Sequence, residues 1–252
     1  MRKVYIIISL LLFTMISCNF SHEPKVVLKD SAQYYSVSKD LNIQADAEYD
    51  SIIAIYKVGV DSVMEEYIVD SEQGLSRKRP SGALNNLIAD AMRIEISKEV
   101  DFNVDFAMYN YYGIRNTLPK GKIIKGNVFE VLPFENQATL VHLSPKGMKH
   151  LLTYIYKSGG QPISGLEVEY TDSINYNATI GGNEFDTTAY YWVVTSDYAA
   201  NGGDNMNFFQ ESDSIFYTGI LIRNNLLNYL ENLNANNLKL TADTVSRITY
   251  KD

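Results

Sequence analysis

The chain contains few of the residues that build metal and redox centres. Among its 252 residues are one cysteine and three histidines, and no His-x-His, His-Glu-x-x-His or Cys/His cluster occurs. The histidines at positions 22, 142 and 150 are scattered, which argues against a zinc or dinuclear site built on imidazoles. We expect His142 and His150 to lie on a strand surface and a helix face, without a catalytic role.

Positive charge is also in deficit. Lys and Arg number 22 against 30 Asp and Glu, which gives a formal net charge of -8. Nucleic acid is therefore not an expected partner, and an anionic ligand would need a local basic pocket. With 46% apolar and 21% charged residues, the chain can bury a sizeable core without disulfides or a structural metal, and its length suits one domain.

The first 18 residues have the pattern of a bacterial secretory signal. Arg2 and Lys3 precede an apolar run over residues 4–13, and Cys18 follows a short Ile-Ser segment. The run is shorter than the roughly 20 residues that a membrane span needs. Cys18 stands where a lipoprotein signal places its modified cysteine, so residues 1–17 are predicted to be removed and Cys18 to carry a lipid anchor.

An ordinary signal peptide with an incidental cysteine is the alternative, because Ile16 and Ser17 match a lipoprotein signal only permissively. The lipoprotein interpretation places the protein in the bacterial cell envelope, held to the membrane on the periplasmic face or at the cell surface. Residues 18–47 are polar and are predicted to be a tether. The folded domain is then predicted to occupy residues 48–252.

Hydrophobic periodicity predicts a mixture of helices and short strands. The helix that starts at Pro145 has a favourable beginning, with Ser144 as its cap and Pro at the first helical position. Helices are predicted over 49–67, 83–92, 126–132, 145–158 and 220–233, and strands over 104–109, 123–124, 138–143, 166–170, 190–196 and 245–250. This order predicts an α+β (mixed α/β) domain with a mostly antiparallel sheet flanked by helices, rather than a doubly wound parallel sheet.

Four segments, in order, resemble motifs of one known family. Gly82–Met92 (GALNNLIADAM) resembles G-N-L-I-A-D-A-M, and Asn110–Arg115 (NYYGIR) resembles N-G-G-G-I-R, followed by Val131–Phe134 (VLPF). Ile163–Leu166 (ISGL) resembles V-S-G-L, and Tyr198–Asp204 (YAANGGD) resembles F-L-A-N-G-G-D. The segments together resemble the C-terminal domain of the 5'-nucleotidase family, which includes UDP-sugar hydrolases and 2',3'-cyclic phosphodiesterases.

The resemblance implies a role for five residues in nucleotide recognition. Phe134 and Tyr198 would sandwich the base, and Asn110 would contact it. Asp204 would accept hydrogen bonds from the ribose hydroxyls, and Arg115 would reach the phosphate. These roles suit the side chains, because aromatic faces stack on bases, carboxylates accept from diols and guanidinium groups bind phosphate.

The two aromatic residues and the basic run before the second predicted helix also have plainer interpretations. Taken alone, Phe134 after a proline is more often a core residue than a stacking platform, and Tyr198 at a strand end is similarly ambiguous. The basic run Arg77, Lys78 and Arg79 is either a solvated charge run or a phosphate-facing segment, since the resemblance places an arginine just before the helix that follows. Only the joint placement of the aromatic and charged residues favours a binding site.

Two tyrosines depart from the family pattern. Tyr111 and Tyr112 stand where the family has glycines, and they could fill the base pocket, reshape it or point away from it. If the turn needs a positive φ there, each tyrosine would cost about 1–2 kcal/mol. Tyr198 in place of Phe is a milder change that adds a hydroxyl group in need of a partner.

In the family, a separate N-terminal metallophosphatase domain performs the hydrolysis with two metals. Its Asp-x-His and Asn-His-Glu/Asp ligand motifs do not occur before residue 48. We therefore expect no cofactor in this chain, no activity of the chain alone, and metals only in a partner. The favoured hypothesis is the nucleotide-recognition half of a split 5'-nucleotidase that works with a separately encoded metallophosphatase. The alternatives are a non-catalytic lipoprotein that binds nucleosides or nucleotides, and a relic domain with a closed pocket.

Overall fold

The computed structural model describes residues 38, 44, 46–241 and 243–251. Internal contacts divide the chain into two units, Met1–Ala47 and Glu48–Asp252. The predicted signal, Cys18 and nearly all of the tether lie outside the described residues. Within the part that is described, no helix is long and apolar enough to cross a membrane.

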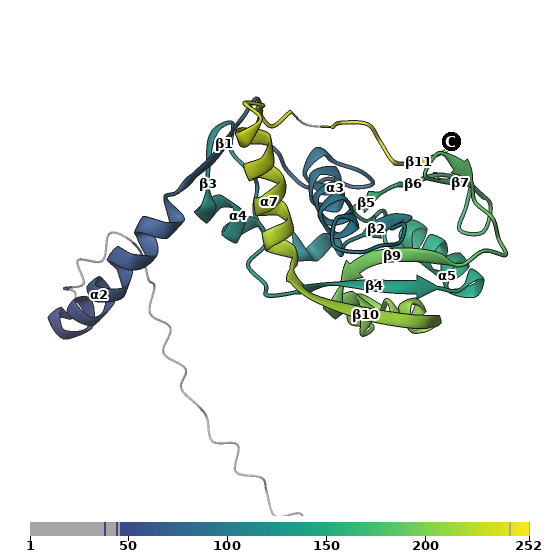
Figure 1. Cartoon of the computed structure of the whole chain (residues 1–252), viewed down its shortest axis with the longest axis horizontal. Coiled ribbons are helices and arrows are strands. Elements are labelled where there is room, and N and C mark those ends of the chain that lie inside the picture. Colours follow the sequence, from purple (N-terminus) through teal and green to yellow (C-terminus); the bar gives the residue numbers. More distant parts are fainter. Residues whose placement is uncertain (1–37, 39–43, 45, 242, 252) are drawn as a thin grey trace, which may run out of the picture. The chain divides into compact units, whose positions relative to one another are not determined.

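A five-stranded sheet forms the centre of the second unit (Figure 1). Its strands, in spatial order, are β10 (Ser212–Leu221), β4 (Gln137–Leu143), β9 (Tyr191–Ser196), β2 (Phe106–Met108) and β5 (Ile163–Ser164). β4 is antiparallel to both β10 and β9, whereas β2 is parallel to β9 and antiparallel to β5. The sheet is therefore mixed, with antiparallel pairing dominant, and the expected α+β class is confirmed.

The other strands of the described residues form two smaller sheets. One has the order β11 (Ile248–Tyr250), β6 (Leu166–Tyr170), β7 (Tyr176–Ile180) and β8 (Asn183–Glu184), with β11 parallel to β6. The other is the antiparallel pair of β1 (Tyr67–Ser71) and β3 (Gly121–Ile124).

Apart from the short α6, which was not predicted, the helices of the described residues lie close to their predicted positions. They are α2 (Ala47–Met64), α3 (Ala83–Ser97), α4 (Lys125–Val131), α5 (Pro145–Lys157), the short α6 (Asp197–Ala200) and α7 (Ile222–Ala235). The 3-10 turns of the described residues are η2 (Tyr111–Gly113), between β2 and β3, and η3 (Gly203–Asn205) and η4 (Asn207–Gln210), between α6 and β10. The predicted cap of α5 is confirmed, because the Ser144 hydroxyl accepts a hydrogen bond from the Gly147 amide at 3.1 Å.

The central sheet separates two hydrophobic cores. Successive residues of a strand point to opposite faces, so Leu140 of β4 enters one core and Val141 enters the other. The first core is formed with α3 and α7, which pack against each other, and the second is formed with α5 and the β6–β7 hairpin. Because both faces are covered, the strands are fixed in register, and the segments at their ends are held in place.

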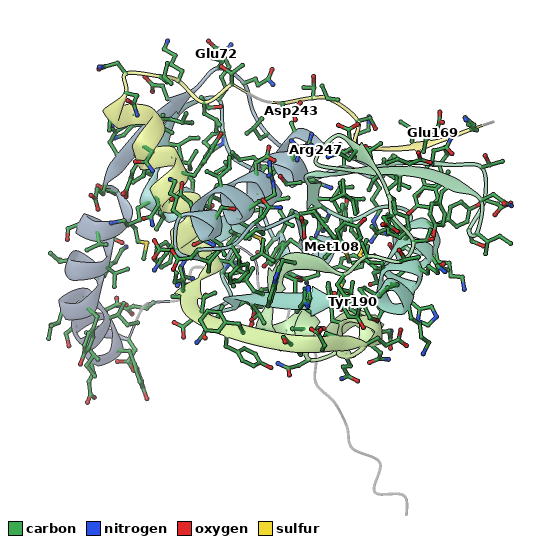
Figure 2. The ribbon with its side chains drawn as sticks, turned by 45° about the vertical axis from the view of Figure 1, so that its right-hand side comes forward. Glu72, Met108, Glu169, Tyr190, Asp243 and Arg247 are labelled. Atoms are coloured by element: carbon green, nitrogen blue, oxygen red, sulfur yellow. The ribbon has the colours of Figure 1, made fainter. Side chains whose placement is uncertain are left out.

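An ion-pair network fastens the segment before β11 to α3, and Figure 2 labels two of its members, Asp243 and Arg247. The Arg247 guanidinium donates to both carboxylate oxygens of Asp90 at 2.8 and 2.7 Å, and to Asp243 at 2.6 Å. Burial acts to raise the pKa of Asp243, but hydrogen bonds from Val245, Arg247 and Asn86 lower it overall. The Asp243 carboxylate is therefore held in its charged form.

Candidate functional site

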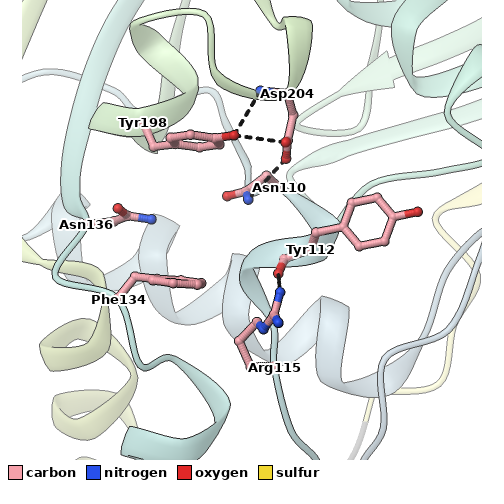
Figure 3. Close-up of a pocket in the computed structure, with 7 residues that line it drawn as sticks. All are labelled: Asn110, Tyr112, Arg115, Phe134, Asn136, Tyr198 and Asp204. Carbon is pink, nitrogen blue, oxygen red and sulfur yellow. Dashed lines mark hydrogen bonds between the residues drawn. The ribbon is translucent and has the colours of Figure 1, made fainter. Parts of the chain in front are cut away.

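One cavity of about 280 Å³ lies at an end of the central sheet (Figure 3). The five residues predicted to bind a nucleotide all line it, together with two others, and the complete set is Asn110, Tyr112, Arg115, Phe134, Asn136, Tyr198 and Asp204. The structure thus brings together side chains that are as far as 94 positions apart in the sequence, such as Asn110 and Asp204.

The strand directions explain why these residues meet. β2 and β9 are parallel and both end at this edge of the sheet, while β4 is antiparallel to β9 and begins there. Asn110 follows β2, Phe134 and Asn136 precede β4, and Tyr198 follows β9. The residues next to the ends of three neighbouring strands therefore form the cavity wall at one edge of the sheet, which is where open sheets commonly place binding loops.

Phe134 and Tyr198 form two opposite walls of the cavity (Figure 3). Phe134 is 47% exposed and Tyr198 is 45% exposed, so neither ring is a core residue. The plainer interpretation of Phe134 as core is therefore wrong. Two rings that face a common space and keep nearly half their surface in water can gain burial energy by covering that surface with a flat ligand.

Asp204 is tied to both of its polar neighbours in the cavity. The Tyr198 hydroxyl donates to Asp204 Oδ1 at 2.9 Å and accepts from the Asp204 amide at 3.2 Å. Asn110 Nδ2 donates to Asp204 Oδ2 at 3.4 Å. The hydrogen bond to the Asp204 carboxylate, together with partial burial, raises the pKa of Tyr198, so its hydroxyl is a donor at neutral pH.

Asn110 presents a buried acceptor without a partner. The residue is 5% exposed, and its Oδ1 has no hydrogen-bond partner within the described residues. A buried polar atom left unsatisfied costs about 1–3 kcal/mol. Because Asn110 lines the cavity, a ligand donor or a bound water would recover that energy.

Asn136 is a cavity residue that the sequence analysis missed. It stands two positions after Phe134, and its backbone carbonyl accepts from the Ile222 amide at 3.0 Å, which fixes it between β4 and α7. Burial raises the pKa of Tyr109 to about 12, although a hydrogen bond with the Asn136 side chain acts to lower it. The sequence feature that could have identified Asn136 is an amide side chain just before a predicted strand and two positions after a predicted stacking residue.

The basic run before α3 does not line the cavity. Arg77 donates to the carbonyls of Tyr111 at 3.1 Å and Ile114 at 2.6 Å, and so fastens the η2 turn. The Arg79 guanidinium lies 4.3 Å from the centre of the Tyr111 ring, and Lys78 is exposed. Two members of the run therefore pack on the turn that follows Asn110, rather than forming a solvated charge run.

The two tyrosines that replace glycines do not close the cavity. Tyr111 and Tyr112 lie in the η2 turn, and neither has a positive φ, so the expected backbone penalty does not arise. Tyr111 packs against Arg77 and Arg79, and Tyr112 stands in the cavity wall with 55% of its surface exposed. The Tyr112 ring points away from the space between Phe134 and Tyr198 (Figure 3), so that space stays open.

The donor set of the cavity does not suit a pair of divalent metals. It offers one carboxylate, two amides and a guanidinium, whereas such metals prefer several carboxylate or imidazole ligands. Among residues 46–241 and 243–251, no three His, Cys, Asp or Glu side chains come close enough to hold a metal ion. The cavity is instead suited to a flat, polar organic group.

Comparisons with known proteins agree with this geometry. The model of the family described as "5'-nucleotidase, C-terminal domain" matches residues 57–211, which is more than half of the chain. The chain therefore belongs to the 5'-nucleotidase C-terminal domain family. The same resemblance was predicted from the four ordered motifs, and it is confirmed.

Two relatives and one solved structure show how far the likeness extends. Endonuclease YhcR of Bacillus subtilis (strain 168) is 30% identical over 132 residues, which cover 51% of this chain and 10% of that protein. A 5'-nucleotidase of Vibrio cholerae is 26% identical over 135 residues, covering 50% of this chain and 24% of the relative. The structure of a 5'-nucleotidase precursor from Thermus thermophilus matches with a TM-score of 0.67 and 25% identity, over 81% of this chain and 43% of that one. The chain thus corresponds to less than half the length of each.

Proposed function

We propose that this chain binds the nucleoside part of a nucleotide in the cavity, with the base between Phe134 and Tyr198. The observation that carries the proposal is the pair of half-exposed rings on opposite walls of one open space. Stacking a base on an aromatic ring contributes about 1–3 kcal/mol and tolerates different bases. The family membership and the nucleotidase relatives support the same ligand class.

The polar residues complete the proposed binding mode. Asp204 accepts from the ribose hydroxyls, while Asn110 and Asn136 offer amide groups to the base. Arg115 is exposed at the cavity wall, its guanidinium 5.8 Å from the centre of the Phe134 ring, and it reaches the phosphate. A guanidinium binds phosphate oxygens with strong, charge-assisted hydrogen bonds. The proposed ligand is thus bound from base to phosphate by side chains of this chain.

We further propose that the chain is the recognition half of a two-chain 5'-nucleotidase. The donor set of the cavity suits a nucleoside and not a metal pair, so phosphate ester hydrolysis would depend on metals held by a separately encoded metallophosphatase. Alone, the chain would bind nucleotides without hydrolysing them. Capture of nucleosides without any catalysis is the competing outcome, and it would be seen as binding that no partner converts into phosphate release.

The pattern of residues 1–18 supports a proposed location in the bacterial cell envelope, with a lipid on Cys18. Labelled fatty acid should be incorporated into the protein in cells, and the Cys18→Ser variant should lose the label. Incorporation at the same level in both proteins would contradict the anchor.

Calorimetric titration with AMP tests the binding proposal. Replacing Phe134 by Ala removes one stacking face and should weaken binding about tenfold or more. Phe216→Ala is a matched control, because Phe216 is 54% exposed and does not line the cavity. No binding by the wild type, or equal binding by the two variants, would contradict the proposed site.

A further inference from the structure

We propose that the Tyr112 ring is a stacking platform for a second flat group, so that the site accepts dinucleotides, in which a diphosphate joins two nucleosides. This second ring site rests on the proposed function, which puts the first base between Phe134 and Tyr198. It goes beyond that function by naming the class of nucleotide and by giving Tyr112 a role in choosing it.

Tyr112 presents an open ring beside the cavity. The residue lines the cavity and is 55% exposed, and its ring points away from the space between Phe134 and Tyr198 (Figure 3). The Tyr111 ring lies at 86° to it with ring centres 5.5 Å apart, so these two rings do not stack face to face. A flat group that covers the exposed ring would bury apolar surface. Because the family pattern has glycine at position 112, this ring is a property of the present sequence.

Three arginines surround Tyr112. The guanidinium carbons of Arg77 and Arg79 lie 5.7 and 5.2 Å from the centre of its ring, and Arg115 donates to its carbonyl at 3.3 Å. Within residues 46–241 and 243–251, none of the three arginines forms an ion pair with a carboxylate. In a chain whose formal net charge is -8, this is a local concentration of positive charge. It suits a ligand that carries a diphosphate next to a ring.

Arg115 connects the two ring sites. Its guanidinium carbon lies 5.8 Å from the centre of the Phe134 ring, and the same group donates to the Tyr112 carbonyl. In Figure 3 the guanidinium stands between the Phe134 and Tyr112 side chains. A phosphate bound by Arg115 would therefore have the first base on its Phe134 side and the Tyr112 ring on its other side. A mononucleotide ends at its phosphate and leaves Tyr112 uncovered, whereas a dinucleotide continues to it.

Calorimetric titration with AMP, ADP, ADP-ribose and diadenosine diphosphate tests the second ring site. Diadenosine diphosphate should bind to Tyr112→Ala about tenfold more weakly than to the wild type, because one base loses its stacking face. The other three ligands have no second base, so their affinities should change by less than about twofold. Tyr112→Phe keeps the ring and should bind all four ligands as the wild type does.

The variants are chosen so that loss of folding is not mistaken for loss of the site. Tyr112 has no positive φ, and Arg115 bonds to its backbone carbonyl, which alanine retains. Retained AMP binding by Tyr112→Ala reports that the first base site is intact. Tyr190→Ala is a matched control, because Tyr190 is 47% exposed and does not line the cavity. This control should bind all four ligands with wild-type affinity.

The outcomes separate the second ring site from the proposed function. A Tyr112→Ala variant that weakens AMP and diadenosine diphosphate by the same factor, or that changes neither, would overturn the second site while leaving nucleotide binding intact. An equal loss for ADP-ribose would show that a sugar covers Tyr112, and it would overturn the dinucleotide class. Absence of AMP binding by the wild type would overturn the proposed function and the second site with it.

Discussion

Individual side chains at the cavity are positioned by neighbours that do not line it. Arg77 lies outside the lining set, yet its guanidinium holds the carbonyls of Tyr111 and Ile114 at either end of the η2 turn. Asn110 and Arg115 flank that turn, so the geometry of two proposed ligand contacts depends on a residue that need not touch the ligand.

Replacing Arg77 by Met should lower the free energy of unfolding by about 1–3 kcal/mol, because two carbonyls lose their donor. Arg79→Met is the matched control. Arg79 stacks on the same ring at 4.3 Å and makes no such bond to the turn, so its loss should cost about 0.5–1 kcal/mol. Urea denaturation measures both, and an equal cost in the two variants would show that the hydrogen bonds to the turn contribute little.

The helices differ sharply in what they contribute to stability. α3 was predicted from an apolar stripe, and that stripe is buried in the first core, with Ile88 fully covered. α2 was predicted from a similar stripe, but none of its described residues is buried, and Ile53 is 58% exposed. Periodicity alone therefore identifies a helix without showing whether another element covers its apolar face.

Ile88→Ala should destabilise the protein by about 2–5 kcal/mol, because it leaves a cavity in a closely packed core. The same change at Ile53 should alter the free energy of unfolding by less than about 0.5 kcal/mol, as is usual at exposed positions. Chemical denaturation of the two variants compares the free-energy cost of the same Ile→Ala change at a buried and at an exposed position. A large loss at Ile53 would show that the apolar face of α2 is covered in solution.

At the scale of the whole molecule, the ends of the central strands hold the residues that line the cavity. In the proposed two-chain enzyme, nucleotide recognition and phosphate ester hydrolysis belong to different chains. The chain spans less than half of the relatives and of the solved structure described above. The residues at the cavity suit recognition of a nucleoside, whereas ester hydrolysis in such enzymes depends on metals that polarise the phosphate and generate hydroxide. Binding and hydrolysis should therefore be separable in experiments.

Under the proposal of a two-chain enzyme, adding this chain to a metallophosphatase that lacks its own recognition domain should raise phosphate release from AMP at least about tenfold, because recognition of the nucleoside positions the phosphate. The Phe134→Ala variant should give little increase, and Phe216→Ala should match the wild type. Removing divalent metal with a chelator should abolish hydrolysis by the mixture while leaving AMP binding by this chain unchanged. Phosphate release that is unaffected by the chain would argue against the two-chain enzyme.

The extent of sequence-based prediction can be judged from particular elements. α3, α4, α5, β4 and β6 were predicted within a few residues, because each has a clear apolar period and defined ends. β10 was not predicted, since Ser212–Leu221 lies at an exposed sheet edge and its residues do not alternate between water and a core. β1 and β7 were missed as well. An edge strand carries a weak pattern because pairing, not burial, defines it. This reason covers β10 alone, since β7 lies between β6 and β8 and most of β1 is buried.

The sequence by itself determined the family, the α+β class and the five residues proposed to bind the ligand, because ordered motifs and apolar periods are local properties of the chain. Only the tertiary structure decided that Phe134 is exposed, that Asn136 joins the cavity and that Tyr111 packs on arginines instead of filling the space. Those facts depend on which strand ends meet at one edge of the sheet, and side-chain direction there is set by contacts between residues far apart in sequence.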